Sequence, residues 1–417
     1  MKFLKIFNQL IIYFFYFLLV SIFFFTIYIV NTSDPFTKSF RKEFKTVVKK
    51  GNVKANFFNN YRVEHLPNTQ FTKINFKKIK LDFIDISNCH IGSCYTFYIE
   101  QYNENLIIAD RKGDINFIKF SELGNKKVSH KKISTNLDFD RILDTFVMND
   151  HIYISGKKTL SEDVTEIQIV KGKINENSIK FKKLIGLKSD KCIFKYSVHS
   201  GKIQSFKGDN NKLLLSVNSS GWTDNPSMES LDPNSICGKI LLIDVNSKNY
   251  EVYSSGHRNI IGLYSDENVI ISTEHGPYSG DEINNIKNKK SYGWPVASYG
   301  ERYSRGNSDD GPFYKKNHKS NGFVEPIFSF IPAIGISEII KLPNNFSNMW
   351  QDNFLVSSLN AKKLHRVKFD EDYNKIIYSE EIYIGDRMRD LLYNLKNQKI
   401  ILALELTGSL GILTNTQ

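Results

Sequence analysis

The sequence predicts an all-β protein, and more specifically a β-propeller built from four-stranded sheets. Short runs rich in β-branched and aromatic residues recur from about Ile74 to the C-terminus, and turn residues separate them. No convincing amphipathic helical pattern interrupts these runs. This part of the chain, roughly 340 residues, is too long for one β-sandwich but suits a propeller.

The predicted strands follow one another at short intervals on both sides of a Gly- and Pro-rich stretch. They are Leu106 to Ala109, Ile115 to Phe120, Ile152 to Ser155, Glu166 to Val170, Ile179 to Lys182, Ile203 to Phe206, Leu213 to Val217, Ile240 to Val245, Tyr250 to Tyr253, Asn268 to Thr273, Phe354 to Ser357, Leu364 to Phe369, Ile376 to Ile384, Ile400 to Leu404 and Leu410 to Leu413. No crisp repeat motif accompanies them, so their spacing does not fix the number of blades.

Composition narrows the class of protein. The chain has 417 residues, of which 41% are hydrophobic and 24% charged, so it can bury one large core or two ordinary ones. Its formal net charge is +12, but the basic residues are scattered through predicted strands and no nucleic-acid-binding motif accompanies them. We therefore expect no nucleic-acid partner, and attraction to an anionic membrane surface fits the charge better.

The N-terminal segment predicts a membrane span. The run from Leu10 to Val30 carries no charge and is long enough to cross about 30 Å of hydrocarbon as a helix. It is longer than the usual apolar core of a cleaved signal peptide, and no small-residue cleavage site follows it. We expect an uncleaved anchor in residues 1–31, a basic tether in 32–72 and the propeller in 73–417; a cleaved signal is the alternative.

The four cysteines give a weak signal. Cys89 and Cys94 are near enough in sequence to close a small disulfide loop in an oxidising compartment, or they remain two thiols. Cys192 and Cys237 are expected to be small buried hydrophobic residues.

The stretch from Gly256 to Gly300 has the composition of a binding site. It contains Gly-His-Arg-Asn, Ser-Thr-Glu-His-Gly-Pro, Gly-Asp-Glu-Ile-Asn and Tyr-Gly-Trp-Pro in that order. Arg258 and Asn259 supply donors suited to carboxylates, while turn carbonyls and acidic side chains supply the oxygens that Ca²⁺ prefers. The plainer interpretation is an elaborate loop between strands.

These motifs resemble the pyrroloquinoline quinone (PQQ)-dependent sugar dehydrogenases, the glucose/sorbosone dehydrogenase family. The resemblance implies a six-bladed propeller with PQQ on its axis and an aldose oxidised at C1. It also implies that Arg258 and Asn259 face the cofactor and that the carbonyls of Gly276 and Pro277 bind Ca²⁺ beside it. A second, structural Ca²⁺ would use Glu282 and the carbonyl of Tyr292.

Two further segments resemble this family. His199 lies in Val-His-Ser-Gly-Lys, which is similar to the family segment whose histidine takes the proton from the sugar's C1 hydroxyl, and a histidine titrates near the pH such a base needs. Arg387 and Arg389 lie in Arg-Met-Arg-Asp, which resembles the segment facing the tricarboxylate cofactor. Glu405 replaces an aspartate of that family near the last strand, so the resemblance places it among the cofactor-binding residues.

Several positions depart from the family pattern. Val198 replaces the acid before the histidine, Asn360 replaces a lysine, and Phe328 and Ile331 stand where an aromatic pair is usual. The segment Asp138 to Phe146 occupies the place of an early glutamine. A propeller that only binds carbohydrate or protein, and a cofactor-free hydrolase of lactonase type, are therefore the alternative functions.

The resemblance also bears on location. More basic residues follow the predicted span, between Lys38 and Lys50, than precede it, at Lys2 and Lys5. This distribution by itself favours a cytoplasmic domain. The family implies the opposite, and large domains translocate with limited regard to charge. We expect a single-pass inner-membrane protein with its propeller in the periplasm, passing electrons to a respiratory acceptor.

Overall fold

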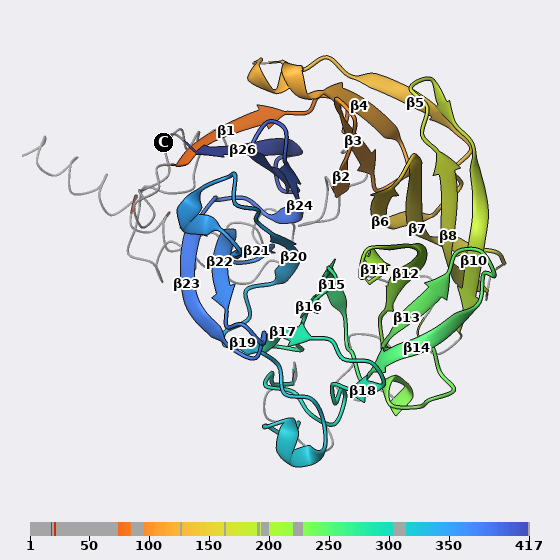
Figure 1. Ribbon diagram of the computed structural model, residues 1–417, viewed down its shortest axis with the longest axis vertical. Coiled ribbons are helices and arrows are strands. Elements are labelled where there is room, and N and C mark those ends of the chain that lie inside the picture. Colours follow the sequence, from red (N-terminus) through yellow and green to blue (C-terminus); the bar gives the residue numbers. More distant parts are fainter. Residues whose placement is uncertain are drawn as a thin grey trace, which may run out of the picture. The chain divides into compact units, whose positions relative to one another are not determined.

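The computed structural model describes residues 74–84, 96–125, 127–161, 164–189, 192, 200–219, 228–302 and 314–415, together with Leu18 and Ser21. The strands of residues 74–415 form six sheets arranged around one axis (Figure 1). The all-β class and the six blades are confirmed.

Each sheet is a blade whose strands run outward from the axis in mainly antiparallel order. Blade one contains β2 (Phe97–Tyr102), β3 (Asn105–Asp110), β4 (Ile115–Lys119), β5 (Lys131–Thr135) and the short β9 (Ser178–Ile179). Blade two contains β6 (Arg141–Met148), β7 (His151–Thr159), β8 (Thr165–Lys173) and β10 (Phe181–Lys188). Blade three contains β11 (Ile203–Phe206), β12 (Asp209–Val217), β13 (Lys239–Asp244), β14 (Tyr250–Ser255) and β18 (Lys290–Ser291).

The second half of the ring is built in the same way. Blade four contains β15 (Ile260–Ser265), β16 (Ile270–Glu274), β17 (Asp281–Asn285) and β19 (Phe328–Phe330). Blade five contains β20 (Ile336–Lys341), β21 (Phe354–Ser358), β22 (Lys363–Phe369) and β23 (Ile376–Tyr383). Blade six contains β24 (Met388–Asn394), β25 (Lys399–Leu404), β26 (Ser409–Asn415) and β1 (Ile74–Lys80). The short 3₁₀ turns are η1 (Phe120–Gly124), η2 (Met228–Ser230), η3 (Lys319–Asn321) and η4 (Asn348–Trp350).

The two ends of the propeller sequence close the ring together. Strand β1 pairs antiparallel with β26, in register from Ile74 opposite Asn415 to Lys80 opposite Ser409. The first strand thus completes the blade that the last three strands begin. Such closure leaves no blade without a neighbour and protects sheet edges.

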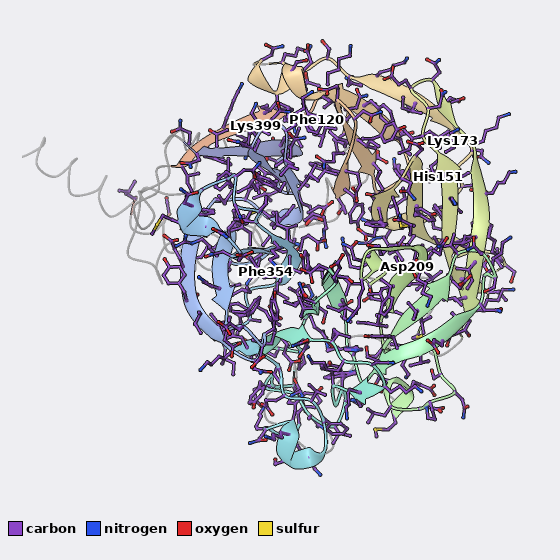
Figure 2. All side chains as sticks on the ribbon, viewed as in Figure 1. Phe120, His151, Lys173, Asp209, Phe354 and Lys399 are labelled. Carbon is purple, nitrogen blue, oxygen red and sulfur yellow. A yellow bond between two sulfur atoms is a disulfide. The ribbon has the colours of Figure 1, made fainter. Side chains whose placement is uncertain are left out.

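Apolar side chains fill the space between each pair of neighbouring blades. One buried cluster joins blades four and five and includes Phe354 of β21, labelled in Figure 2. The middle strand β3 is buried along its whole length, whereas the outer strand β23 alternates exposed and partly buried residues. Burying one large aliphatic or aromatic side chain contributes about 1.5–3 kcal/mol relative to leaving it exposed, so these clusters hold the blades together.

A lysine crosses the axis of the ring. Lys202, which precedes β11 in blade three, pairs with Asp144 of β6 and with Glu338 of β20. Blades two and five lie opposite each other in the ring order, so the ammonium group joins two sides of the propeller. Burial raises the pKa of Asp144 to about 6, although Lys202 opposes that shift.

The antiparallel order of the strands collects the expected site residues at one end of the ring. Hairpin turns between the first and second strands of each blade lie at one end, such as that between β6 and β7. Loops between the second and third strands, and the connections from blade to blade, lie at the other end. The turn after β16, the loop after β25 and the segment before β24 all belong to this second end.

The structure corrects the interpretation of two cysteines. Cys192 and Cys237 are buried, as expected, but they form a disulfide with a Cα–Cα distance of 5.8 Å. They lie 45 residues apart in two different loops, so their spacing gave no sign of the pairing. Cys89 and Cys94 lie outside the described residues.

The structure describes little of the N-terminal segment. Within the described residues, no helix is long and apolar enough to cross a membrane. The predicted span from Leu10 to Val30 lies outside them, except for Leu18 and Ser21.

Candidate cofactor and active site

One buried carboxylate ties together the first two motifs of the Gly256 to Gly300 stretch. Glu274, at the end of β16, accepts a hydrogen bond from the backbone N–H of Arg258 and lies 3.1 Å from Nδ1 of His257. The other ring nitrogen of His257 is 2.8 Å from Oγ of Ser254, and the imidazole stacks on Tyr292 with a ring-centre distance of 4.7 Å. Glu274 and His257 therefore fix the backbone that presents Arg258.

The histidine of the His-Gly-Pro turn has a structural role. The backbone N–H of His275 donates to the carbonyl of Asn259 at 3.0 Å, and its Nε2 donates to the carbonyl of Ile336 at 2.6 Å. Burial lowers the pKa of His275, so the neutral ring is favoured at neutral pH. The side chain fixes the turn between blades four and five and is not placed as a free base.

An aspartate and a glycine fix the backbone of the same turn. Asp281 accepts hydrogen bonds from the backbone N–H groups of Gly276 at 3.1 Å, Ile334 at 3.0 Å and Ile336 at 2.9 Å. A side chain at Gly276 would place its Cβ 2.1 Å from the carbonyl oxygen of Ser279. The turn therefore requires glycine at that position.

The same turn can hold a hard cation at its next two carbonyls. The residues that the structure describes form no hydrogen bond to the carbonyl oxygens of Gly276 or Pro277. The preceding carbonyl, that of His275, accepts a hydrogen bond from Nη1 of Arg258 at 3.0 Å. Gly276 and Pro277 thus fit the first Ca²⁺ site expected from the sequence.

The side chain of His318 lies at the second expected Ca²⁺ site. The ring of His318 lies with Nδ1 2.8 Å from the carbonyl oxygen of Tyr292 and Nε2 3.4 Å from Oε1 of Glu282. Burial, with the nearby charge of Glu274, raises the pKa of Glu282 well above its ordinary value. Glu282 and Tyr292 are thus brought together as predicted, but the space between them is filled.

Arg258 and Asn259 lie together at the inner end of blade four. The Arg258 guanidinium lies over the ring of Trp294, 5.3 Å from its centre, and the residue is 6% exposed. Asn259 is also buried, and its Oδ1 has no hydrogen-bond partner among the described residues. An unsatisfied buried amide oxygen is typical of a position that meets a ligand or water.

Two arginines meet one carboxylate at the entrance to blade six. Arg389 of β24 donates from Nη2 to both oxygens of Glu405, at 2.9 and 3.0 Å, and Nε of Arg387 lies 3.4 Å from Oε2. Thr96 also donates to the fully buried Glu405. Although burial opposes ionisation, the two guanidiniums lower the pKa of Glu405 below its ordinary value. Glu405 is therefore an ion-pair partner of both arginines, and its place in the cofactor site stays a prediction.

A third arginine completes this group. Arg141, the first residue of β6, is half-buried, and it interacts electrostatically with Arg389 and Glu405. Its Nε has no hydrogen-bond partner among the described residues, and burial lowers its pKa to about 10. The sequence analysis missed Arg141, although it noted that the surrounding segment departs from the family pattern. We call Arg141, Arg387, Arg389 and Glu405 the arginine cluster.

The arginine cluster and the His-Gly-Pro turn are neighbours. The charges of both Arg258 and Arg389 bear on the pKa of His275. The strand β20 links the two, because Ile336 accepts from His275 and Ser337 Oγ donates to the carbonyl of Arg389 at 3.0 Å. The predicted cofactor and metal residues Arg258, Asn259, Gly276, Pro277, Arg387, Arg389 and Glu405 thus lie at one end of the propeller.

Other predicted positions are exposed or outside the described residues. His199 and Val198 lie outside them, while the next residue, Ser200, donates to the carbonyl of Ile260 at 2.7 Å. Phe328 is 42% exposed and Ile331 63% exposed, and Asn360 is exposed as well.

The chain is a six-bladed propeller with the arginine cluster and the His-Gly-Pro turn at one end. The family model for glucose/sorbosone dehydrogenases matches residues 97–409, about three quarters of the chain. The chain belongs to this family and is a divergent member of it.

Curated relatives match over shorter segments. An uncharacterised protein of Synechocystis is 36% identical over 143 residues, which is 34% of this chain and 33% of that protein. The aldose sugar dehydrogenase YliI of Escherichia coli is 27% identical over 164 residues, which is 38% of this chain and 43% of that enzyme. The aligned segments therefore span less than half of either relative.

Solved structures agree in fold over most of the chain. The soluble aldose sugar dehydrogenase of E. coli in its apo form has a TM-score of 0.66 and 18% identity, covering 82% of this chain and 99% of that one. The PQQ-bound aldose sugar dehydrogenase of Streptomyces coelicolor has a TM-score of 0.56 and 17% identity, covering 83% and 99%. At these identities the likeness establishes the six-bladed propeller alone.

Proposed function

We propose that this chain is a quinoprotein oxidoreductase that oxidises an aldose at C1. The observation that carries the proposal is the arginine cluster, in which Arg387 and Arg389 pair with the single carboxylate of Glu405 and the charge of Arg141 adds to theirs. The excess positive charge, beside the free carbonyls of Gly276 and Pro277, suits a cofactor with several carboxylates and a Ca²⁺ ion. Family membership and the PQQ-bound relative support the same assignment.

Each part of the site has a role in this proposal. Arg387, Arg389 and Arg141 hold the carboxylates of PQQ, and the carbonyls of Gly276 and Pro277 hold Ca²⁺. When bound, PQQ accepts the hydride and Ca²⁺ polarises its reacting carbonyl. Arg258, fixed by Trp294 and Glu274, stabilises negative charge that develops near the turn.

His199 is the proposed base. It would take the proton of the C1 hydroxyl as hydride leaves C1, which yields the oxidised sugar. The proposal rests on the resemblance of its segment to the family, since His199 itself lies outside the described residues.

The first test is binding and turnover of the wild type. Chelator-treated protein is titrated with PQQ and Ca²⁺, binding is followed by absorbance, and dye-linked oxidation of several aldoses is measured. We expect PQQ binding that depends on Ca²⁺, and oxidation of at least one aldose. If PQQ does not bind, the alternative of a carbohydrate- or protein-binding propeller takes over, with exposed Phe328 and Ile331 at its rim.

The second test replaces the base. His199→Gln should reduce the rate of aldose oxidation by about two to four orders of magnitude, because a general base contributes about that much. PQQ affinity should stay close to that of the wild type. His151→Gln, at a hairpin on the other end of the ring, is the control and should oxidise aldoses at the normal rate. A His199 variant with normal turnover would refute the mechanism.

We also propose that residues 10–30 anchor the protein in the inner membrane with the propeller in the periplasm. The Cys192–Cys237 disulfide supports an oxidising compartment, because such bonds are rare in reducing cytosol. The protein should fractionate with membranes with its N-terminus intact. Recovery of a soluble form that begins near Asn31 would argue for a cleaved signal instead.

A further inference from the structure

The His318 ring contacts residues that belong to two neighbouring blades, Glu282 and Tyr292. Glu282 belongs to β17 of blade four, whereas Tyr292 follows β18, the outermost strand of blade three. The His318 ring lies between them, and the residue is only 1% exposed. The ring therefore joins the outer parts of two neighbouring blades at the position where the sequence predicts a structural Ca²⁺.

The surroundings of His318 hold the ring in this position. The ring of Tyr299 stacks on the imidazole with a ring-centre distance of 5.4 Å and an interplanar angle of 14°. The carbonyl of His318 accepts the backbone N–H groups of Asn321 and Phe323, both at 3.0 Å, as the chain turns through η3. Gly322 closes that turn in the left-handed conformation, with φ of 84°. The loop is thus folded around a buried side chain.

The two nitrogens of the ring face different neighbours, and only Nδ1 makes a hydrogen bond among the described residues. A carbonyl oxygen can only accept, so Nδ1 carries a hydrogen and donates to Tyr292. Nε2 faces the Glu282 carboxyl group across 3.4 Å. The Tyr292 carbonyl that the resemblance assigns to Ca²⁺ therefore already accepts a hydrogen bond from His318, and the ring lies against the Glu282 side chain as well.

The His318 ring presents nitrogen atoms where Ca²⁺ would need oxygen atoms. A cavity of about 10 Å³ lies beside the ring, lined by Glu274, Glu282 and Tyr292 among others, and it has room for about one water molecule. Ca²⁺ takes six to eight oxygen ligands at about 2.3–2.6 Å, and imidazole nitrogen is not among its preferred ligands. Among the described residues, no group of three or more His, Cys, Asp or Glu side chains is arranged to hold a metal ion.

We propose that His318 takes the place of a structural Ca²⁺ ion in this chain, so that the Glu282–Tyr292 position binds no metal. Of the two calcium sites that the sequence predicts, only the one at Gly276 and Pro277 is then available. The inference concerns the bare protein and does not depend on whether PQQ is bound or a sugar is oxidised.

The test measures calcium-dependent stability of the full chain without PQQ. Chelator-treated protein is melted with and without millimolar Ca²⁺ for the wild type, Glu282→Gln, His318→Ala and the double variant. We expect the wild type and Glu282→Gln to show the same calcium-dependent change in Tm. His318→Ala should gain an extra rise, on the order of a few degrees, because uncovered Glu282 and Tyr292 oxygens bind Ca²⁺. The double variant should lose that extra rise.

Controls separate this effect from general destabilisation. His365→Ala also removes a buried histidine, one that packs on Phe330, and should lower Tm without adding any response to Ca²⁺. A calcium-dependent Tm rise in the wild type that Glu282→Gln abolishes would overturn the proposal, and this comparison holds even if His318→Ala fails to fold. A Zn²⁺-dependent rise in the wild type that His318→Gln abolishes would overturn it too, since His318 would then be a metal ligand.

Discussion

The His-Gly-Pro turn and the arginine cluster use charge in different ways. Around the turn, each buried carboxylate has its own partners: Glu274 has His257, Asp281 has three backbone N–H groups, and Glu282 has His318. In the arginine cluster, Arg387 and Arg389 both pair with Glu405, and the charge of Arg141 acts on the same group. The first region is a charge-matched scaffold that fixes backbone, and the second keeps a surplus of positive charge that an anionic ligand can neutralise.

Removing the carboxylate of the arginine cluster should have the largest effect on stability. Glu405→Gln leaves the guanidiniums of Arg387 and Arg389 without a charged partner. Removing one member of a buried ion pair costs about 3–5 kcal/mol. We therefore expect the unfolding free energy of Glu405→Gln, measured by urea denaturation, to fall by about that amount. Glu381→Gln is the control, because Glu381 is exposed and its ion pair with Lys363 lies at the surface, and it should cost no more than about 1 kcal/mol.

The same variant predicts a pH dependence. The arginines lower the pKa of Glu405, so its contribution is complete above the unfolded value of about 4.3 and is lost as the pH falls through the lower folded value. The difference in unfolding free energy between the wild type and Glu405→Gln should be largest near neutral pH and shrink below about pH 4. A difference that stays constant down to pH 3 would show that Glu405 acts through packing rather than charge.

A second prediction concerns the surplus charge itself. Arg389→Ala should weaken PQQ binding about 10- to 100-fold, because a hydrogen bond to a charged group contributes about 1.5–3 kcal/mol. The unpartnered Nε of Arg389 is the atom available to the ligand. Lys396→Ala removes one positive charge at an exposed turn and should leave the affinity unchanged. Equal losses in both variants would mean that the net charge of the protein, not the arginine cluster, attracts the cofactor.

The two regions also differ in how far the sequence predicts them. The turn could be interpreted because its parts are close in sequence: Gly-His-Arg-Asn directly precedes β15, His-Gly-Pro directly follows β16, and Gly276 is where a Cβ would collide with Ser279. The regular recurrence of the predicted strands likewise depends on local alternation of apolar residues. Strand existence and the all-β class were therefore predictable.

Contacts between distant segments were not predictable from local patterns. The charge of Arg389 acts on Arg141 because the first strands of blades two and six both lie at the axis of the ring, and nothing in the Arg141 segment indicates that neighbour. His318 lies 3.4 Å from Glu282, although no local sequence pattern connects its loop to the strand that carries Glu282. The disulfide between Cys192 and Cys237 is a third case, because the two cysteines lie in different loops that come together only in the folded chain.

The smallest effect, and the sharpest contrast with Glu405, is expected for Arg141→Gln. A half-buried guanidinium without a carboxylate of its own is a desolvated charge, which the lowering of its pKa to about 10 reflects. Removing that charge should leave the unfolding free energy within about 0.5 kcal/mol of the wild type or raise it slightly. PQQ affinity should nevertheless fall, by about 3- to 10-fold, because a partly exposed ionic contact contributes about 1 kcal/mol. Glu405→Gln lowers stability, whereas Arg141→Gln would lower only affinity, and titration with PQQ beside urea denaturation separates the two. If Arg141→Gln lowered stability as Glu405→Gln does, the guanidinium would belong to the scaffold and the surplus of positive charge would reduce to Arg387 and Arg389.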